Sequence, residues 1–151
     1  MNGRENKKLN DLFFVCSLID YIARQTKNRR RTVVNALGKK KLEHLYDLAD
    51  VYHTENIDQI THELVSECRI PTGIFDNIAS CRYKIPTHWD MGKVYHRLIA
   101  AICETENKPV IDALTEVYNS WISDSIDDYN SSMYYENPDY LFASYRAGKP
   151  L

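Results

Sequence analysis

Glycine and proline are scarce in this chain of 151 residues, with five of each. A sandwich or barrel of short strands needs many tight turns, and such turns depend on these two residues. Strict alternation of apolar and polar residues over a strand length is also missing from the sequence. The sequence therefore excludes a turn-rich all-β fold and favours helices.

Long apolar runs are missing as well, because none reaches the roughly 18–20 residues that a membrane-spanning helix needs. The most apolar stretch, residues 12–22, is interrupted by Ser17, Asp20 and Tyr21. The polar residues before it do not form a secretory signal. The cysteines form no C-x-x-C pair, so we expect free thiols, most of them buried on helix faces. They are Cys16, Cys68, Cys81 and Cys103. These observations predict a cytoplasmic protein.

Sequence signatures of catalysis and cofactor binding are missing. There is no P-loop, no G-x-S-x-G, no G-x-G-x-x-G and no H-E-x-x-H. The five histidines show no H-x-x-x-H spacing, and none joins a cysteine at zinc-ligand spacing. We therefore expect no enzyme activity, no cofactor and no bound metal, and we look for a function based on binding.

Apolar residues recur at the i, i+3, i+4 spacing of amphipathic helices along most of the chain. Capping residues and breakers predict the helix ends, among them Asn56, Asp90 and Gly148. The predicted helices span about residues 11–25, 33–37, 40–53, 57–68, 91–102, 109–126 and 138–147, with a brief one at 75–80.

These elements predict an all-α fold, a compact multi-helix bundle. A four-helix N-terminal unit covers residues 1–69, and a connecting loop punctuated by proline and glycine covers residues 70–92. A C-terminal unit of two or three helices covers residues 93–151 and ends in an acidic, tyrosine-rich segment. We expect the two units to pack as one domain, because the chain length suits a single domain.

Charge is unevenly distributed, although the net formal charge is only −2. Residues 21–42 contain eight bases and no acid, whereas residues 109–145 contain seven acids and no base. Such blocks mark surfaces that bind a partner, or they are two faces that neutralise each other across the fold. The sequence leaves both alternatives open.

The acidic block is rich in tyrosine, which is enriched at protein interfaces. An acidic, aromatic surface suits a basic protein partner or the nucleotide-binding cleft of a partner, and it repels nucleic acid. The alternative is that these tyrosines pack onto the helices of their own chain. The predicted partner-binding residues are Asp124, Asp127, Asp128, Tyr129, Tyr134, Tyr135 and Tyr140.

The basic block surrounds two predicted helices, 33–37 and 40–53, with the proportions of a helix-turn-helix. Its bases suit phosphates, and Asn35 or Lys41 has the reach to contact base edges. The predicted recognition helix soon becomes acidic, which weakens this hypothesis. A DNA-binding transcriptional regulator is therefore the second interpretation. The predicted nucleic-acid-binding residues are Arg29, Arg30, Arg31, Lys39, Lys40 and Lys41.

Residues 11–66 resemble a family of short bacterial proteins that carry one small helical domain of unknown function. The resemblance rests on Phe13-Phe14, on residues 18–23, and above all on Tyr52-His53-Thr54-Glu55 between two predicted helices. Members are often encoded beside an ADP-ribosyltransferase-like protein, so the resemblance implies a toxin–antitoxin or phage-defence partnership. The basic segments 27–31 and 39–41, and the residues after 66, depart from the family pattern.

These observations predict a non-enzymatic bacterial binding protein, an antitoxin-like or adaptor partner of a neighbouring effector. In this hypothesis the acidic tyrosine segment covers a basic cleft of the effector. The basic N-terminal segment would then bind operator DNA. No membrane is expected to be involved, and the oligomeric state is left open.

Overall fold

The computed structural model describes the backbone of residues 3–151 and the side chains from residue 7 onward. Within this part of the chain there are helices and no strands, so the predicted all-α fold is confirmed. The elements are α1 (Gly3–Thr26), α2 (Arg30–Asp47), α3 (Ala49–Tyr52), α4 (Ile57–Glu67), α5 (His88–Glu106), α6 (Val110–Tyr118), α7 (Trp121–Ile126), the 3-10 helix η1 (Met133–Tyr135) and α8 (Pro138–Ala147).

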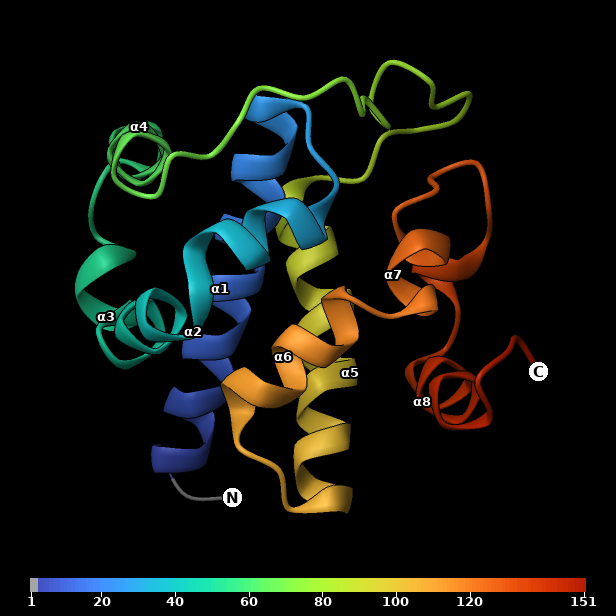
Figure 1. Ribbon diagram of the computed structural model, residues 1–151. Coiled ribbons are helices and arrows are strands. Elements are labelled where there is room, and N and C mark those ends of the chain that lie inside the picture. The colour runs from blue at the N-terminus through green and yellow to red at the C-terminus, as the bar shows by residue number, and fades with distance from the viewer. Residues whose placement is uncertain (1–2) are drawn as a thin grey trace.

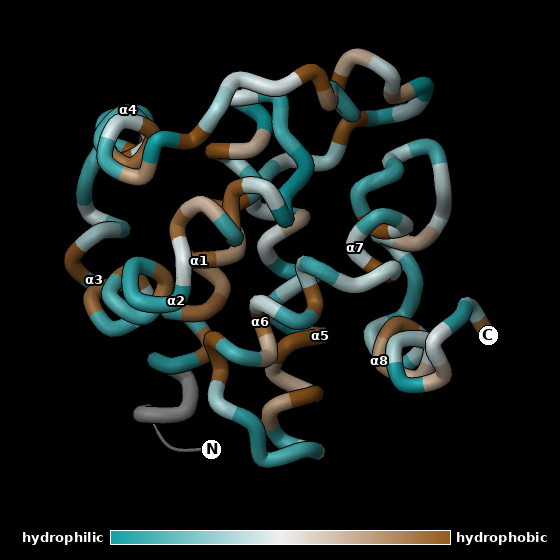
Figure 2. Tube along the Cα trace, in the orientation of Figure 1, coloured by the Kyte–Doolittle hydropathy of each residue, from teal (hydrophilic) through white to brown (hydrophobic). Residues whose placement is uncertain are grey.

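The helices α1 and α5 lie side by side and antiparallel at the centre of the molecule (Figure 1). In that view α2 and α6 cross in front of them, α3 and α4 lie on one side, and α7 and α8 lie on the other. Figure 2 shows hydrophobic residues along the two central helices. Buried apolar side chains from both predicted units form one cluster, so the two units share a core.

The two central helices approach each other closely where Gly92 of α5 meets Ser17 of α1, and both residues are buried. A Cβ atom at residue 92 would lie 2.9 Å from the Cα atom of Ser17 and nearer still to its hydroxyl. Protein interiors are close-packed, so such an overlap would push the helices apart. The missing side chain at residue 92 therefore sets the spacing of the central pair.

Replacing Gly92 with Ala is expected to lower the free energy of unfolding by about 1–3 kcal/mol through overpacking. The loss should appear even though alanine favours a helix interior by about 1 kcal/mol over glycine. Urea unfolding of Gly92→Ala, Ser17→Gly and the double variant measures the coupling. Removing the Ser17 side chain should recover part of the loss, and strictly additive effects would contradict the close contact.

Several helix ends agree with the sequence. The Asn56 side chain accepts hydrogen bonds from the backbone N–H groups of Asp58 and Gln59 and begins α4. Asn137 caps α8 in the same way, and Gly148 ends it with φ 78°. At such a positive φ, glycine avoids the steric cost that a side chain would bring.

Other helix ends differ from the prediction. The first helix begins at Gly3 rather than near residue 11, because the intervening residues contain no breaker and Lys7 pairs with Asp11 one turn later at 3.0 Å. Residues 77–80 form turns, not the brief helix predicted at 75–80. The helix predicted at 109–126 breaks between Tyr118 and Trp121 into α6 and α7.

Gly38 separates two helical segments, as predicted, although both segments are counted within α2. It lies inside α2 with φ 77° and ψ 164°, so α2 is kinked there. The helix predicted at 40–53 instead ends at Asp47 and resumes as α3.

Asp90 is not the N-cap of α5. Thr87 has that role, and its hydroxyl accepts a hydrogen bond from the Asp90 N–H at 3.0 Å. The Asp90 carboxylate accepts one from the Thr87 N–H at 2.9 Å. This reciprocal pair is a capping box, which needs an acid or amide three residues after the cap.

Candidate functional site

The two charged blocks predicted to bind partners contact each other. Arg29 and Arg31 both reach one oxygen of Asp124, at 3.2 and 2.5 Å. Between α2 and α6, Lys39 pairs with Asp112 at 3.2 Å. Ion pairs across the fold fit the second alternative, in which the blocks neutralise each other.

Few bases of the predicted nucleic-acid surface remain free. Lys41 pairs with Glu67 at 3.2 Å, and Asn35 exchanges two amide hydrogen bonds with Asn119 at 2.9 and 3.0 Å. Within the described side chains, seven of the eight bases in residues 21–42 have an ion pair. The exception is Lys40, which is exposed. A phosphate backbone would have to displace these internal ion pairs, so the structure adds no support to the DNA-binding hypothesis.

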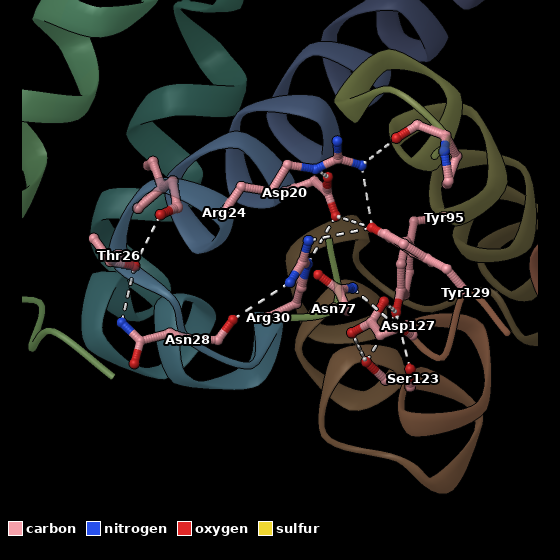
Figure 3. A network of polar contacts seen from close by, with 12 residues as sticks. Asp20, Arg24, Thr26, Asn28, Arg30, Asn77, Tyr95, Ser123, Asp127 and Tyr129 are labelled. Carbon is pink, nitrogen blue, oxygen red and sulfur yellow. Dashed lines mark hydrogen bonds and ion pairs between the residues drawn. The ribbon is translucent and has the colours of Figure 1, made fainter. Parts of the chain in front are cut away.

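Arg30 is fully buried at the centre of a polar network that Figure 3 shows from close by. Its Nε donates to one oxygen of Asp20 at 2.8 Å, and the Nε of Arg24 donates to the other at 2.6 Å. Because both contacts are charge-assisted, this carboxylate holds α2 against α1. Arg24 also donates to the Pro86 carbonyl at 2.7 Å, which fixes the chain before α5.

Tyr129 closes the network from the C-terminal part of the chain. Its hydroxyl accepts hydrogen bonds from the guanidinium groups of Arg24 and Arg30, each at 3.2 Å. Burial raises the pKa of Tyr129 above its usual range, and the nearby Asp20 carboxylate acts in the same direction. The phenol therefore stays neutral and serves as a hydrogen-bonding partner.

Asp127 lies beside this network and is also buried (Figure 3). The Tyr95 hydroxyl donates to one of its oxygens at 2.7 Å, and the Ser123 hydroxyl donates to the other at 3.4 Å. Burial raises the pKa of Asp127 to about 6, although the charge of Arg30 opposes that shift. Asn77 donates to the Asp127 backbone carbonyl at 2.9 Å and ties the chain before α5 to α7.

Three of the predicted binding residues do not belong to a surface. Arg30, Asp127 and Tyr129 are buried, with at most 3% of each residue exposed. Successive residues of a helix point about 100° apart. Arg30 therefore points inward, whereas Arg29 and Arg31 on either side of it reach the exposed Asp124. A run of like residues in the sequence did not reveal this difference.

The remaining tyrosines of the acidic segment mostly pack onto their own chain. The Tyr134 ring lies 5.6 Å from the Tyr129 ring and 4.9 Å from the Tyr135 ring. Tyr140 donates to the backbone carbonyl of Leu151 at 2.8 Å. Tyr135 is 68% exposed, and Asp128 is also exposed. This segment therefore offers much less free aromatic surface than the sequence predicts.

A surface that the sequence did not indicate runs across α1 and α5. Five aromatic rings follow one another there, and we call them the aromatic stripe. Tyr21 lies 4.9 Å from His88, and His88 lies 4.7 Å from Trp89. Phe13 lies 5.7 Å from Trp89 and 5.4 Å from His96. Trp89 is 44% exposed, and the other four rings are partly buried.

Free positive charge also lies outside the basic block of the sequence. Among the exposed bases that form no ion pair with any side chain that the structure describes, four belong to the end of the connecting segment and to α5. They are Arg82, Lys84, Lys93 and Arg97. These four residues do not form a basic block in the sequence, so the charge distribution along the chain did not indicate them.

No family model, curated protein or solved structure matches the chain. The resemblance to the bacterial family therefore stays a prediction. From Gly3 onward, no helix is long and apolar enough to cross a bilayer. The described side chains include no group of three His, Cys, Asp or Glu residues placed to hold a metal ion.

Proposed function

We propose that the protein is a non-enzymatic binding protein whose ligand is another protein, an antitoxin-like or adaptor partner of a neighbouring effector. The observation that carries this proposal is the aromatic stripe on α1 and α5. Tryptophan is the residue type most enriched in interface hot spots, and Trp89 is 44% exposed among other rings. Burying these rings against a partner would supply the apolar core of an interface.

The stripe borders a groove that suits an apolar anchor from a partner. Trp89 and Phe13 form one part of its wall, and Phe14 and His53 form another, in a cavity of about 420 Å³ between α1, α3 and α5. Concave, mostly apolar pockets with a few polar groups are typical binding sites. Asp11 and Asp50 add acidic groups at its rim, where Lys7 contacts both, at 3.0 and 3.9 Å.

Two buried groups with strongly raised pKa values, Asp127 and Tyr129, support a binding role over a catalytic one. Asp127 and Tyr129 lie below the surface, and their polar atoms are bonded to other parts of the chain. A catalytic group must come within hydrogen-bond reach of a substrate atom. The network is therefore best explained as the connection between the two halves of the fold.

Replacing Trp89 with Ala is expected to weaken partner binding at least about tenfold, because hot-spot truncations cost about 2 kcal/mol or more. The measurement is affinity capture from the native host with tagged wild-type and variant protein, followed by mass spectrometry and titration of the captured protein. Ile74→Ala is the matched control, since this apolar side chain is 99% exposed but lies outside the stripe.

The wild-type protein should capture one partner in stoichiometric amount, and the Ile74 variant should capture it equally well. Both variants change exposed side chains, so unchanged thermal unfolding would confirm that they fold. Capture of no protein by the wild type, or equal capture by Trp89→Ala, would contradict the proposal.

A further inference from the structure

We infer that the partner docks with an acidic segment, whose carboxylates bind Lys93 and Arg97 on the outer face of α5. This inference rests on the proposed function and names the chemistry of the partner. Trp89, Lys93 and Arg97 are spaced four residues apart, so they lie on the same face of the helix. A segment lying along α5 would meet an aromatic side chain first and then two cations.

The two cations on this face have no direct ion-pair partner among the described side chains. Lys93 and Arg97 are exposed, and neither forms an ion pair with a side chain described by the structure. Like charges one helical turn apart destabilise a helix by a few tenths of a kcal/mol. In residues 21–42, by contrast, seven of the eight bases form ion pairs with acidic residues of the same chain. An external carboxylate can therefore pair with Lys93 and Arg97 without displacing an internal ion pair.

A groove beside these cations has a lining that suits side chains of a docked segment. It lies between α5 and the η1–α8 segment and has a volume of about 270 Å³. Lys93 and Arg97 line one side, and Tyr134 and Tyr135 line the other, over the apolar side chain of Leu98. Arginine can bind a carboxylate through two parallel hydrogen bonds, which gives such a groove directional selectivity.

The acids around this groove favour a protein over a nucleic acid. Asp90 and Glu136 also line it, and each already accepts a hydrogen bond, from Thr87 and Ser132 respectively. Their negative charges would repel the continuous phosphate row of a nucleic acid. A protein segment can place single carboxylates next to Lys93 and Arg97 and keep away from the two acids. The structure therefore assigns this face to an acidic protein segment.

The test uses three fluorescein-labelled probes and the full-length protein. The first probe is a short helical peptide of Glu and Leu, the second has Lys in place of every Glu, and the third is a thymidine oligonucleotide. Fluorescence anisotropy at about 50 and 200 mM salt gives the affinities. We expect the Glu peptide to bind more tightly than the Lys peptide, and more weakly as salt rises.

Charge-reversal variants distinguish the effect of this face on peptide binding from the effect of the protein's net charge. The double variant Lys93→Glu/Arg97→Glu should lose at least about tenfold in affinity for the Glu peptide. The matched control is Lys8→Glu/Lys40→Glu, which changes the net charge equally at two other exposed bases without an ion pair in the described chain, and it should bind as the wild type does.

Three results would overturn the inference: no preference for the Glu peptide, an equal loss in the control variant, or preferred binding of the oligonucleotide, which would assign the face to nucleic acid. The capture experiment separates this inference from the proposed function. If Trp89→Ala loses the host partner but Lys93→Glu/Arg97→Glu keeps it, only the acidic-segment inference fails. If the wild type captures no protein, the proposed function fails.

Discussion

Replacing Asp20 with Ala is expected to lower the free energy of unfolding by about 3–5 kcal/mol, the largest effect among the changes proposed for this protein. The Asp20 side chain is 1% exposed and is shared by Arg24 and Arg30. Without it, the fully buried Arg30 guanidinium would keep only the Asn28 carbonyl, at 3.4 Å, and the Tyr129 hydroxyl. Removing one partner of a buried ion pair is far more costly than losing an ordinary hydrogen bond, because the charge left behind has lost its bonded counter-ion.

Asp124→Ala is the matched control for this prediction. Asp124 also binds two arginines, Arg29 and Arg31, but its side chain is 50% exposed. Exposed pairs contribute about 0–1 kcal/mol, because water screens them. Urea unfolding of both variants at neutral pH measures the difference. Equal losses, or a loss below about 1 kcal/mol for Asp20→Ala, would show that burial does not set the strength of the network.

Replacing Asp127 with Asn is expected to stabilise the protein at neutral pH but not in acid. Burial raises the pKa of Asp127 from 3.8 to about 6, so the folded state prefers the neutral carboxyl group. The stability contributed by this group is complete below about pH 4 and is lost as pH rises through 6. Asparagine stays neutral and can accept the Tyr95 hydrogen bond, so it escapes this loss.

Measured between about pH 4 and pH 7.5, the stability of Asp127→Asn relative to the wild type should rise by about 3 kcal/mol. Thermal and urea unfolding over this pH range give the curve. Asp128→Asn is the control, since Asp128 is exposed and adjacent, and its variant should follow the pH dependence of the wild type. A constant offset between Asp127→Asn and the wild type would contradict the role assigned to burial.

Local chemistry made much of the fold predictable. Asn56, Asn137 and Gly148 end helices where the sequence places them, because capping depends on only a few neighbouring residues. The capping box of Thr87 and Asp90 is equally local, and reading the pair together would have placed the start of α5 correctly. The all-α class followed from periodicity, which packing does not reverse.

The candidate site could not be predicted in the same way. The charge distribution along the sequence shows two blocks, but it does not show that Arg31 pairs with Asp124. These two residues are 93 positions apart, and only the fold brings them into contact. The aromatic stripe joins Phe13 to Trp89 across two helices, and no local spacing links them. The sequence likewise cannot show that Lys93 has no ion-pair partner among the described side chains, because this depends on which residues the fold places around it.

The large sequence separation between Tyr129 and its hydrogen-bonding partners also affects how the chain folds during translation. Tyr129 bonds to Arg30, 99 positions earlier, and to Asp20, 109 positions earlier. At about 5–20 residues per second, a ribosome needs roughly 5–20 seconds to extend the chain from Arg30 to Tyr129. During most of that interval α5, which ends at Glu106, is incomplete, and throughout it Arg30 lacks its hydrogen bond to Tyr129. The N-terminal helices of a nascent chain would therefore expose their apolar faces to chaperones until α5 has been added, and the polar network would be completed only with Tyr129.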